Sequence, residues 1–386
     1  MRKLTLVIIV IICNTIIYAQ EIAEIKNVTI DSKELNQQRE ILIYTPQSYN
    51  ELTLQTYDVI YVFDAQNREL FDLTHSIMTF LERGRMFIVV GITSPYNKEL
   101  NYGRSNDFVP KPVNVKVNPK DYFGGNYGNT ENFMKYIKNE VIPYVEKNYR
   151  TKNRRIVVGH SLGASFALYN FVKDPALFDD YIAISPNLAY DSEWLANELL
   201  NFDFTKLTTK KFLYISNADE GTTYWQNWKP AREKVYTFLK ADSFPNLKYV
   251  IKSFPDYEHW KSFLPSLQAA LTAYFPFLDE QEAKYSTEEK YEITISVKVP
   301  RIGDELYIVG NQPTLGDWQP EKVKMLRKSD FIREIKLQVF APAFFKFTRG
   351  NWDTEAFIKY HDATNIYIDP AKQKNLEFEI SGYVDK

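Results

Sequence analysis

The residues with the clearest chemical potential form the run 157–165, which reads Val-Val-Gly-His-Ser-Leu-Gly-Ala-Ser. An apolar β-branched run before Gly-x-Ser-x-Gly, with a helical pattern after it, is typical of a nucleophile elbow. In such a turn the serine is held exposed at the start of a helix, and larger residues at Gly159 and Gly163 would collide with neighbouring backbone. We therefore predict that Ser161 is a nucleophile, in preference to a serine that lies in a glycine-rich turn by chance.

A nucleophilic serine needs a general base, and the choice among histidines is narrow. His160 is adjacent to the serine and is expected to point away from it, and His75 precedes the elbow in a helical stretch. His361 falls in the C-terminal region, whereas His259 lies between a strand and the last helix before that region. We predict that His259 is the base.

The third member of a catalytic triad is expected between the serine and the histidine, on a loop at the C-terminal end of a strand. The loop after the predicted strand 212–216 carries two adjacent carboxylates, Asp219 and Glu220. Glu220 is the first choice and Asp219 the second. Each could instead be a solvated loop charge or a helix N-cap.

An oxyanion hole needs two backbone N–H donors, and the residue after the nucleophile, Leu162, provides one. The loop after the strand 59–63 reads Asp64-Ala65-Gln66. We expect the second donor to be the amide of Gln66, with Ala65 as the weaker alternative. This chemistry requires no metal or cofactor, and the four histidines are too widely spread for a metal-dependent hydrolase.

These residues must be positioned by a regular framework, and the chain shows one up to about residue 278. Short apolar strand candidates alternate with stretches of helical spacing. Unbroken apolar runs such as 59–63 and 86–90 predict strands that are covered on both faces. We predict strands at 41–46, 59–63, 86–90, 155–159, 181–185, 212–216 and 247–251, and helices at 71–83, 130–148, 164–172 and 263–277. The alternation predicts an α/β fold, a mostly parallel sheet with helices on both faces.

The pattern changes at a charged stretch that begins at Asp279, after which short strand candidates replace helical spacing. A length of 386 residues exceeds what one compact core usually fills. We therefore predict a second, smaller all-β domain, with the boundary at about residues 279–290.

The N-terminus reads as a secretory signal peptide over residues 1–19, because charged Arg2 and Lys3 precede a run of about 14 apolar residues and a small residue at Ala19. That run is shorter than the ~20 residues of a membrane span. The only cysteine, Cys13, lies within it, so the mature chain is expected to lack thiol chemistry. We expect a secreted or periplasmic protein with no stable membrane span after signal removal.

The charge balance and the composition restrict the classes of molecule that the chain is expected to bind. The chain has 47 Lys and Arg against 49 Asp and Glu, which leaves no basic field for nucleic acid. Aromatic residues make up 15% of the chain, which suits stacking on rings.

From about residue 26 to 278 the chain resembles the α/β-hydrolase esterase family that includes feruloyl and acetyl-xylan esterases, enterobactin-type siderophore esterases and formylglutathione hydrolase. The resemblance is carried, beside the elbow, by Arg39–Pro46, Val62–Gln66, Asn139–Tyr144, Ile184–Pro186 and Phe254–His259. It implies a serine esterase domain over residues 21–280, with the acid at the position of Glu220. The family commonly has Ser where Asn187 stands here.

From about residue 288 to 386 the chain resembles a family-20 starch-binding module, on the runs Tyr307–Pro320 and Phe345–Trp352. The resemblance implies a small immunoglobulin-like β-sandwich. It also implies a sugar site in which two tryptophans stack on glucose rings while a lysine and an asparagine bind hydroxyls. The matching residues are Trp318, Lys346, Trp352 and Asn365, followed by Ile366 where the family has Arg. Alternatively, both tryptophans are core residues of the sandwich.

These observations predict a serine carboxylic-ester hydrolase that works through an acyl-enzyme, acting on acylated or feruloylated saccharides. Tyr224, Trp225, Trp228 and Trp260 flank the predicted acid and base, and either line a pocket for an aromatic acyl group or sugar, or are buried packing. The expected partners are an ester substrate and a polysaccharide or oligosaccharide. The alternatives are a siderophore esterase and a non-catalytic carbohydrate-binding protein.

Overall fold

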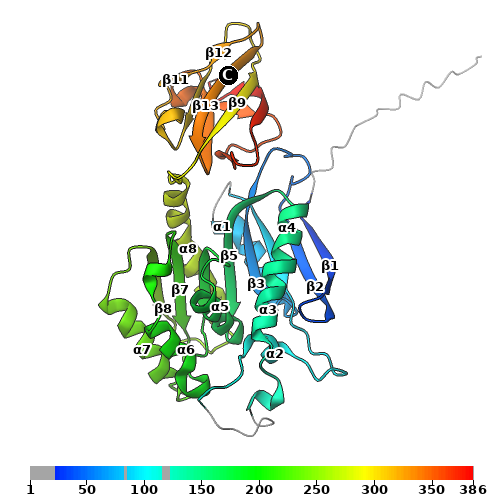
Figure 1. Ribbon diagram of the computed structural model, residues 1–386, viewed down its shortest axis with the longest axis vertical. Coiled ribbons are helices and arrows are strands. Elements are labelled where there is room, and N and C mark those ends of the chain that lie inside the picture. Colours follow the sequence, from blue (N-terminus) through cyan, green and yellow to red (C-terminus); the bar gives the residue numbers. More distant parts are fainter. Residues whose placement is uncertain (1–21, 82–84, 115–121, 386) are drawn as a thin grey trace, which may run out of the picture.

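The computed structural model describes residues 22–81, 85–114 and 122–385, which form an α/β region followed by an all-β region (Figure 1). The predicted signal peptide, residues 1–19, lies outside the described residues. Among the described residues, no helix combines the length and apolar character that a membrane crossing requires.

The α/β region is built on an eight-stranded sheet with the order β1-β2-β4-β3-β5-β6-β7-β8. β1 pairs with β2 and β2 with β4 in antiparallel fashion, and all pairs from β4 to β8 are parallel. The strands are β1 Glu24–Ser32, β2 Gln37–Thr45, β3 Tyr57–Phe63, β4 Phe87–Ile92, β5 Thr151–His160, β6 Asp180–Ile184, β7 Lys211–Asn217 and β8 Leu247–Ser253. Every residue of β3, β4, β6 and β7 is buried, and the unbroken apolar runs 59–63 and 86–90 predict this for β3 and β4.

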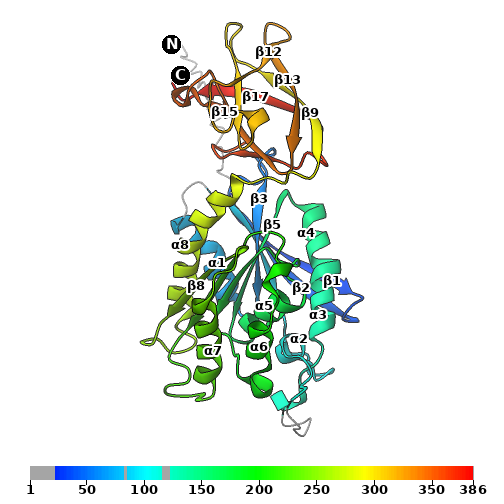
Figure 2. The same cartoon turned by 60° about the vertical axis from the view of Figure 1, so that its left-hand side comes forward.

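Helices cover both faces of this sheet (Figure 2). The first and last helices pack together on one face, and the remaining helices cover the other. The helices are α1 Arg68–Leu81, α2 Arg104–Phe108, α3 Thr130–Tyr136, α4 Ile142–Asn148, α5 Leu162–Lys173, α6 Tyr190–Leu200, α7 Trp228–Ala241 and α8 Phe263–Glu282. The predicted α/β class is confirmed.

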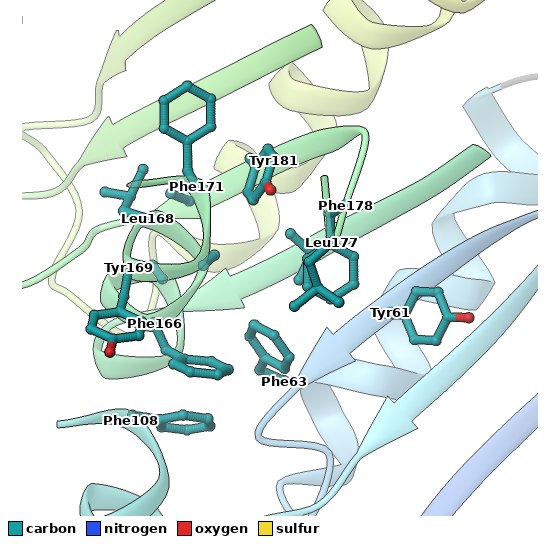
Figure 3. Close-up of a cluster of buried hydrophobic side chains, with 14 of the residues drawn as sticks. Tyr61, Phe63, Phe108, Phe166, Leu168, Tyr169, Phe171, Leu177, Phe178 and Tyr181 are labelled. Carbon is teal, nitrogen blue, oxygen red and sulfur yellow. The ribbon is translucent and has the colours of Figure 1, made fainter. Parts of the chain in front are cut away.

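The helix that carries the elbow, α5, is buried on nearly all sides by aromatic packing (Figure 3). The ring of Phe166 on α5 lies 5.0 Å from that of Phe63 at the end of β3 and 5.4 Å from that of Phe108 on α2. All three side chains are fully buried. Because a closely packed core is hardly compressible, this cluster fixes the start of α5 relative to the strand ends.

Two predicted helices differ in detail from the structure. The predicted helix 130–148 is α3 and α4 joined by a π-helical turn, Ile137–Val141. Pro143 follows this turn and has no N–H to donate to the preceding turn, which explains the local change of hydrogen bonding. The last helix continues past the predicted end at 277 to Glu282, because Asp279 and Glu282 form ion pairs with Arg85.

The all-β region contains a four-stranded sheet, β11-β10-β14-β16, and a five-stranded sheet, β12-β13-β9-β17-β15. Apolar side chains from both sheets form one shared core, as expected of a sandwich. The strands are β9 Lys290–Lys298, β10 Tyr307–Gly310, β11 Val323–Lys324, β12 Leu326–Arg327, β13 Ile332–Phe340, β14 Ala343–Thr348, β15 Ala356–Ile358, β16 Ile366–Ile368 and β17 Asn375–Tyr383.

The all-β region contacts the sheet at the edge where the parallel strands begin (Figures 1 and 2). Asn153, near the start of β5, donates to Asp369 at 3.1 Å, and Asn365 donates to Glu282 at 3.2 Å. The elbow lies at the other end of β5. At a rise of ~3.3 Å per residue, the strand separates the two ends by roughly 25 Å.

Candidate active site

Ser161 occupies the sharp turn between β5 and α5. Its backbone angles are φ 59° and ψ −123°, a conformation that is unusual for a residue with a side chain. The turn is held because the amide of Ser161 donates to the carbonyl of Ile184 at 2.9 Å. A Cβ on Gly159 would lie 2.3 Å from the carbonyl oxygen of Gly163, so glycine is required there. The predicted elbow geometry is therefore present, with Ser161 partly exposed.

Glu220 and His259 are joined by a hydrogen bond from imidazole Nδ1 to carboxylate Oε1. The two residues follow β7 and β8, neighbouring parallel strands whose ends meet at one edge of the sheet. The second oxygen of Glu220 accepts the amide of Ala218 at 2.7 Å. Burial alone would raise the pKa of Glu220, but the bonds from His259 and Ala218 outweigh it and hold that pKa below its usual value. Glu220 is therefore ionised at neutral pH.

Asp219, the second candidate for the acid, does not contact the His259 ring. Its carboxylate accepts the hydroxyl of Tyr224 at 2.5 Å, and Tyr224 in turn accepts the backbone N–H of His259 at 2.7 Å. The adjacent carboxylates thus reach the same histidine by different routes. Glu220 touches its ring, and Asp219 acts on its main chain through a tyrosine.

The loop after β3 contains the two candidates for the second oxyanion donor, the amides of Gln66 and Ala65, and the structure removes one of them. The amide of Ala65 donates to the carbonyl of Ile92 at 3.1 Å, which removes the weaker alternative. The side chain of Gln66 is fixed at both ends, because it donates to Asp64 at 2.8 Å and accepts the amide of Ser94 at 2.7 Å. The Gln66 and Leu162 amides remain the candidate pair.

Ser161 and His259 line a single cavity of about 600 Å³. Its wall contains the three tryptophans that sequence analysis placed beside the acid and base, Trp225, Trp228 and Trp260. Trp225 and Trp260 are 46% and 53% exposed, so these two are not core residues. The remaining lining residues are Asn67, Arg104, Phe123, Leu162, Asn187 and Asn227.

Two of these tryptophans contact the ring of His259. The Trp225 and Trp228 rings stack with centroids 4.5 Å apart. Both rings lie nearly perpendicular to the His259 ring, at interplanar angles of 86° and 85°. Trp225 adopts a positive φ of 49°, a costly conformation for a large side chain. The half-exposed indole of Trp225 therefore faces the cavity that Ser161 also lines.

Arg104 is a cavity residue that sequence analysis did not identify. Its guanidinium forms a two-pronged ion pair with Asp64, whose side chain is 1% exposed. Asp64 itself has a positive φ of 61° and belongs to the loop of the candidate oxyanion donor. The sequence signal for this pair was weak, because Arg104 lies in a five-residue helix with no motif around it.

The four predicted sugar-binding residues lie on different strands and loops of the sandwich. Lys346 and Asn365 line a cavity of about 390 Å³ between the two regions, where Lys346 pairs with Glu355 and Asn365 with Glu282. Neither Trp318 nor Trp352 is among the described residues that line it. Trp318 bonds through its amide to Gly310 at one end of β10, while Trp352 follows the far end of β14. The loop 360–365 bonds to the α/β region at Leu54 and Gln55, and a sugar site shared by the four residues stays a prediction.

Comparison with known proteins supports both parts of this architecture. Residues 32–274 match the model of the family described as "Putative esterase", and residues 290–377 match that of the "Starch binding domain".

Curated relatives match part of the first region. The ferri-bacillibactin esterase BesA of Bacillus subtilis (strain 168) is 27% identical over 154 residues, covering 38% of this chain and 53% of that protein. The siderophore triacetylfusarinine C esterase of Aspergillus fumigatus is 31% identical over 121 residues, covering 31% of this chain and 39% of that protein. The chain thus spans about half or less of the length of these relatives.

Solved structures share the fold. An IroE-like serine hydrolase from Shewanella oneidensis superposes with a TM-score of 0.55 at 23% identity, covering 66% of this chain and 80% of that one. The BES protein from Bacillus cereus gives a TM-score of 0.53 at 20% identity, covering 64% of this chain and 94% of that one. Since one family model covers well over half of the sequence, and the fold and the elbow agree with it, the chain belongs to the esterase family of α/β-hydrolases, with a starch-binding domain at its C-terminus.

Proposed function

We propose that the protein is a serine carboxylic-ester hydrolase with Ser161 as nucleophile, His259 as general base and Glu220 as the acid that orients the base. The observation that carries the proposal is the bond between buried Glu220 and His259 Nδ1, in a cavity that His259 shares with Ser161. This bond keeps the proton on Nδ1, so Nε2 is the nitrogen able to accept a proton from the serine.

The proposed reaction has two steps. Ser161 Oγ attacks the ester carbonyl carbon while His259 Nε2 takes its proton, and the amides of Leu162 and Gln66 stabilise the oxyanion. His259 then gives that proton to the departing alcohol, which leaves an acyl group on Ser161. A water molecule, deprotonated by His259, releases the acid and restores the serine.

We propose that the acyl group is aromatic, and that the alcohol is part of a saccharide. The half-exposed indole of Trp225, which lies against His259 and is backed by Trp228, suits a planar acyl group, since aromatic stacking adds to apolar burial. The match to a starch-binding domain supports the saccharide half. Because that domain lies at the opposite edge of the sheet, it would tether the enzyme to a long polymer and not hold the ester being cut.

The test is hydrolysis of methyl ferulate and p-nitrophenyl acetate by the mature protein, by Ser161→Ala and by Ser76→Ala, an exposed serine on α1. The serine variant in the elbow should lose on the order of 10⁴-fold or more in kcat, and the control should match the native enzyme. Full activity in Ser161→Ala, or no ester hydrolysis by any of the three, would reject the proposal.

A siderophore ester is the second candidate substrate, favoured by the names of the curated relatives. Competition assays with a triscatecholate siderophore and a feruloylated oligosaccharide rank the two by kcat/KM. A preference for the siderophore of tenfold or more would replace the saccharide in the proposal.

We further propose export and glycan binding. Export is checked by N-terminal sequencing of the protein recovered outside the cytoplasm, which should begin near Gln20. Glycan binding is checked by titration with a soluble α-glucan oligosaccharide, using Trp352→Ala because Trp352 is 43% exposed. Affinity that is unchanged in Trp352→Ala would move the sugar site to another face, and no binding would leave a purely structural domain.

A further inference from the structure

The main chain of His259 is bonded on both sides. Its N–H donates to the hydroxyl oxygen of Tyr224 at 2.7 Å. Its carbonyl oxygen accepts the hydroxyl of Ser262 at 2.8 Å and lies 3.1 Å from Nε2 of His160. The surrounding loop is partly exposed at Tyr257 and Trp260, and its main chain is tied to the acid loop by the bond from the Asp219 amide to the Tyr257 carbonyl at 3.1 Å. The first three bonds are the polar contacts that the structure shows to the His259 peptide groups.

Tyr224 links this peptide to Asp219. A phenol has one proton, which the hydroxyl donates to Asp219 at 2.5 Å, so its oxygen is left to accept from His259. Burial and the nearby Asp219 carboxylate raise the pKa of Tyr224 to about 12. The hydroxyl therefore keeps its proton, and the bonded arrangement persists across the working range of an esterase.

His160 supports the carbonyl side. The His160 side chain is 1% exposed, and its ring lies 4.6 Å from the His259 ring at an interplanar angle of 37°. Burial, and to a smaller extent His259, lower the pKa of His160 to about 3, so the ring is neutral. A carbonyl oxygen can only accept a hydrogen bond, so the single ring proton of His160 must be on Nε2.

We propose that Asp219, Tyr224 and His160 are positioning residues that clamp the main chain of His259, so that its ring meets Glu220 and Ser161 together. This inference rests on the proposed function. The physical argument is that a base on a loop serves two partners only when its backbone is fixed, because a displacement of about 1 Å can cost on the order of 10²-fold in rate. The clamp gives a role to the second of the two adjacent carboxylates at this loop, since the proposed triad uses only Glu220.

The first test is Tyr224→Phe, which keeps the ring and removes the hydroxyl. We expect kcat for p-nitrophenyl acetate to fall ten- to a hundredfold while KM stays within twofold, because substrate binding is not the step affected. Tyr257→Phe, on the loop that carries His259 and 42% exposed, is the matched control and should retain full activity. A double variant with Asp219→Asn should lose little beyond either single variant, because the two act through one bond.

The second test separates positioning from general loss of structure. In the native protein the Nδ1 proton of His259, bonded to Glu220, should give a strongly downfield ¹H NMR resonance. Tyr224→Phe should broaden or shift this resonance while circular dichroism is unchanged. His160→Gln retains an N–H donor and should keep most of the activity, whereas His160→Leu should not.

The outcomes distinguish the two proposals. If Ser161→Ala is inactive while Tyr224→Phe and His160→Leu match the native enzyme, the clamp is wrong and the esterase proposal stands. If Ser161→Ala retains activity, the proposed function fails first. An unaltered downfield resonance in Tyr224→Phe would also overturn the clamp, whatever the activity.

Discussion

Glu220 and His259 are 39 residues apart in the chain and meet in a hydrogen bond at the end of two neighbouring parallel strands. The carboxylate is 1% exposed, yet its pKa lies below the usual value, because the bonds from His259 and Ala218 outweigh the effect of burial. A buried carboxylate that stays ionised is suited to orient an imidazole and to stabilise it once it is protonated.

Glu220→Gln should lower kcat on the order of 10³- to 10⁴-fold with little change in fold. The amide can donate to Nδ1 and so favours the wrong tautomer, in which Nε2 carries the proton and cannot act as a base. Steady-state kinetics with p-nitrophenyl acetate measure the effect. Glu258→Gln, an exposed residue beside His259, is the control. A loss of less than tenfold in Glu220→Gln would mean that Glu220 is not the orienting acid.

The buried neutral His160 should make the protein less stable as pH falls. The unfolded chain binds a proton on this residue below pH 6.5, whereas the folded protein does so only near pH 3, so stability falls through that window. Between pH 7 and pH 5 the contribution is about 2 kcal/mol. Urea unfolding at both pH values should show a smaller loss in His160→Gln than in the native protein. Equal losses in the two proteins would show that His160 is not buried in its neutral form.

The elbow, the serine and the base could be predicted because local strain and chain order restrict them. Only glycine fits at Gly159, and His259 is the one histidine in the expected place after the serine. Sequence placed Glu220 before Asp219 but did not decide between them, because the choice depends on contacts that form only in the folded protein. Arg232 of α7 bonds the carbonyl of Glu220, and Tyr224 engages Asp219.

Other elements were missed for physical reasons that differ. β1 lies at the edge of the sheet and is mostly exposed, so it has no strong apolar pattern. Helix α7, by contrast, has apolar residues at helical spacing and could have been predicted from them; Trp228, Ala231, Val235 and Leu239 are all buried. The positions of Trp318 and Trp352 depend on how the loops of the sandwich pack, which neither spacing nor motif determines.

Trp225→Ala should reduce the preference for aromatic acyl groups. Loss of one stacked indole is worth about 1 kcal/mol, which corresponds to roughly a fivefold fall in kcat/KM for methyl ferulate relative to methyl acetate. Trp194→Ala, at a different cavity, is the control. If the ratio for the two esters is unchanged in Trp225→Ala, the indole wall does not contact the acyl group.

Arg104→Met should impair catalysis through the oxyanion loop. The ion pair with Arg104 holds Asp64, which in turn holds the Gln66 side chain. Loss of an oxyanion donor costs about 10²- to 10³-fold in kcat, and loosening one through its support should cost about tenfold or more. Arg68→Met, an exposed arginine at the start of α1, should leave kcat unchanged. A rise in KM alone would instead assign Arg104 to substrate binding.

Glu282→Gln should loosen the contact between the two regions without affecting the active site. Glu282 lies 3.0 Å from Lys152 and 3.2 Å from Arg85, and it accepts Asn365 of the sandwich. Burial alone would lower the pKa of Lys152, but Asp58 and Glu282 outweigh it and raise that pKa, so the cation is well paired.

Removing one partner of such a buried pair costs about 3 kcal/mol. We therefore expect a lower unfolding midpoint and faster proteolysis between Glu282 and Lys290, where α8 ends and β9 begins. Glu280→Gln, 64% exposed on the same helix, is the control. Because the serine lies at the opposite edge of the sheet, kcat for a small ester should be the same in all three proteins. A fall in kcat together with the unfolding midpoint would show that the two edges of the sheet are coupled. An unchanged midpoint and an unchanged cleavage rate would show that this network does not hold the sandwich in place.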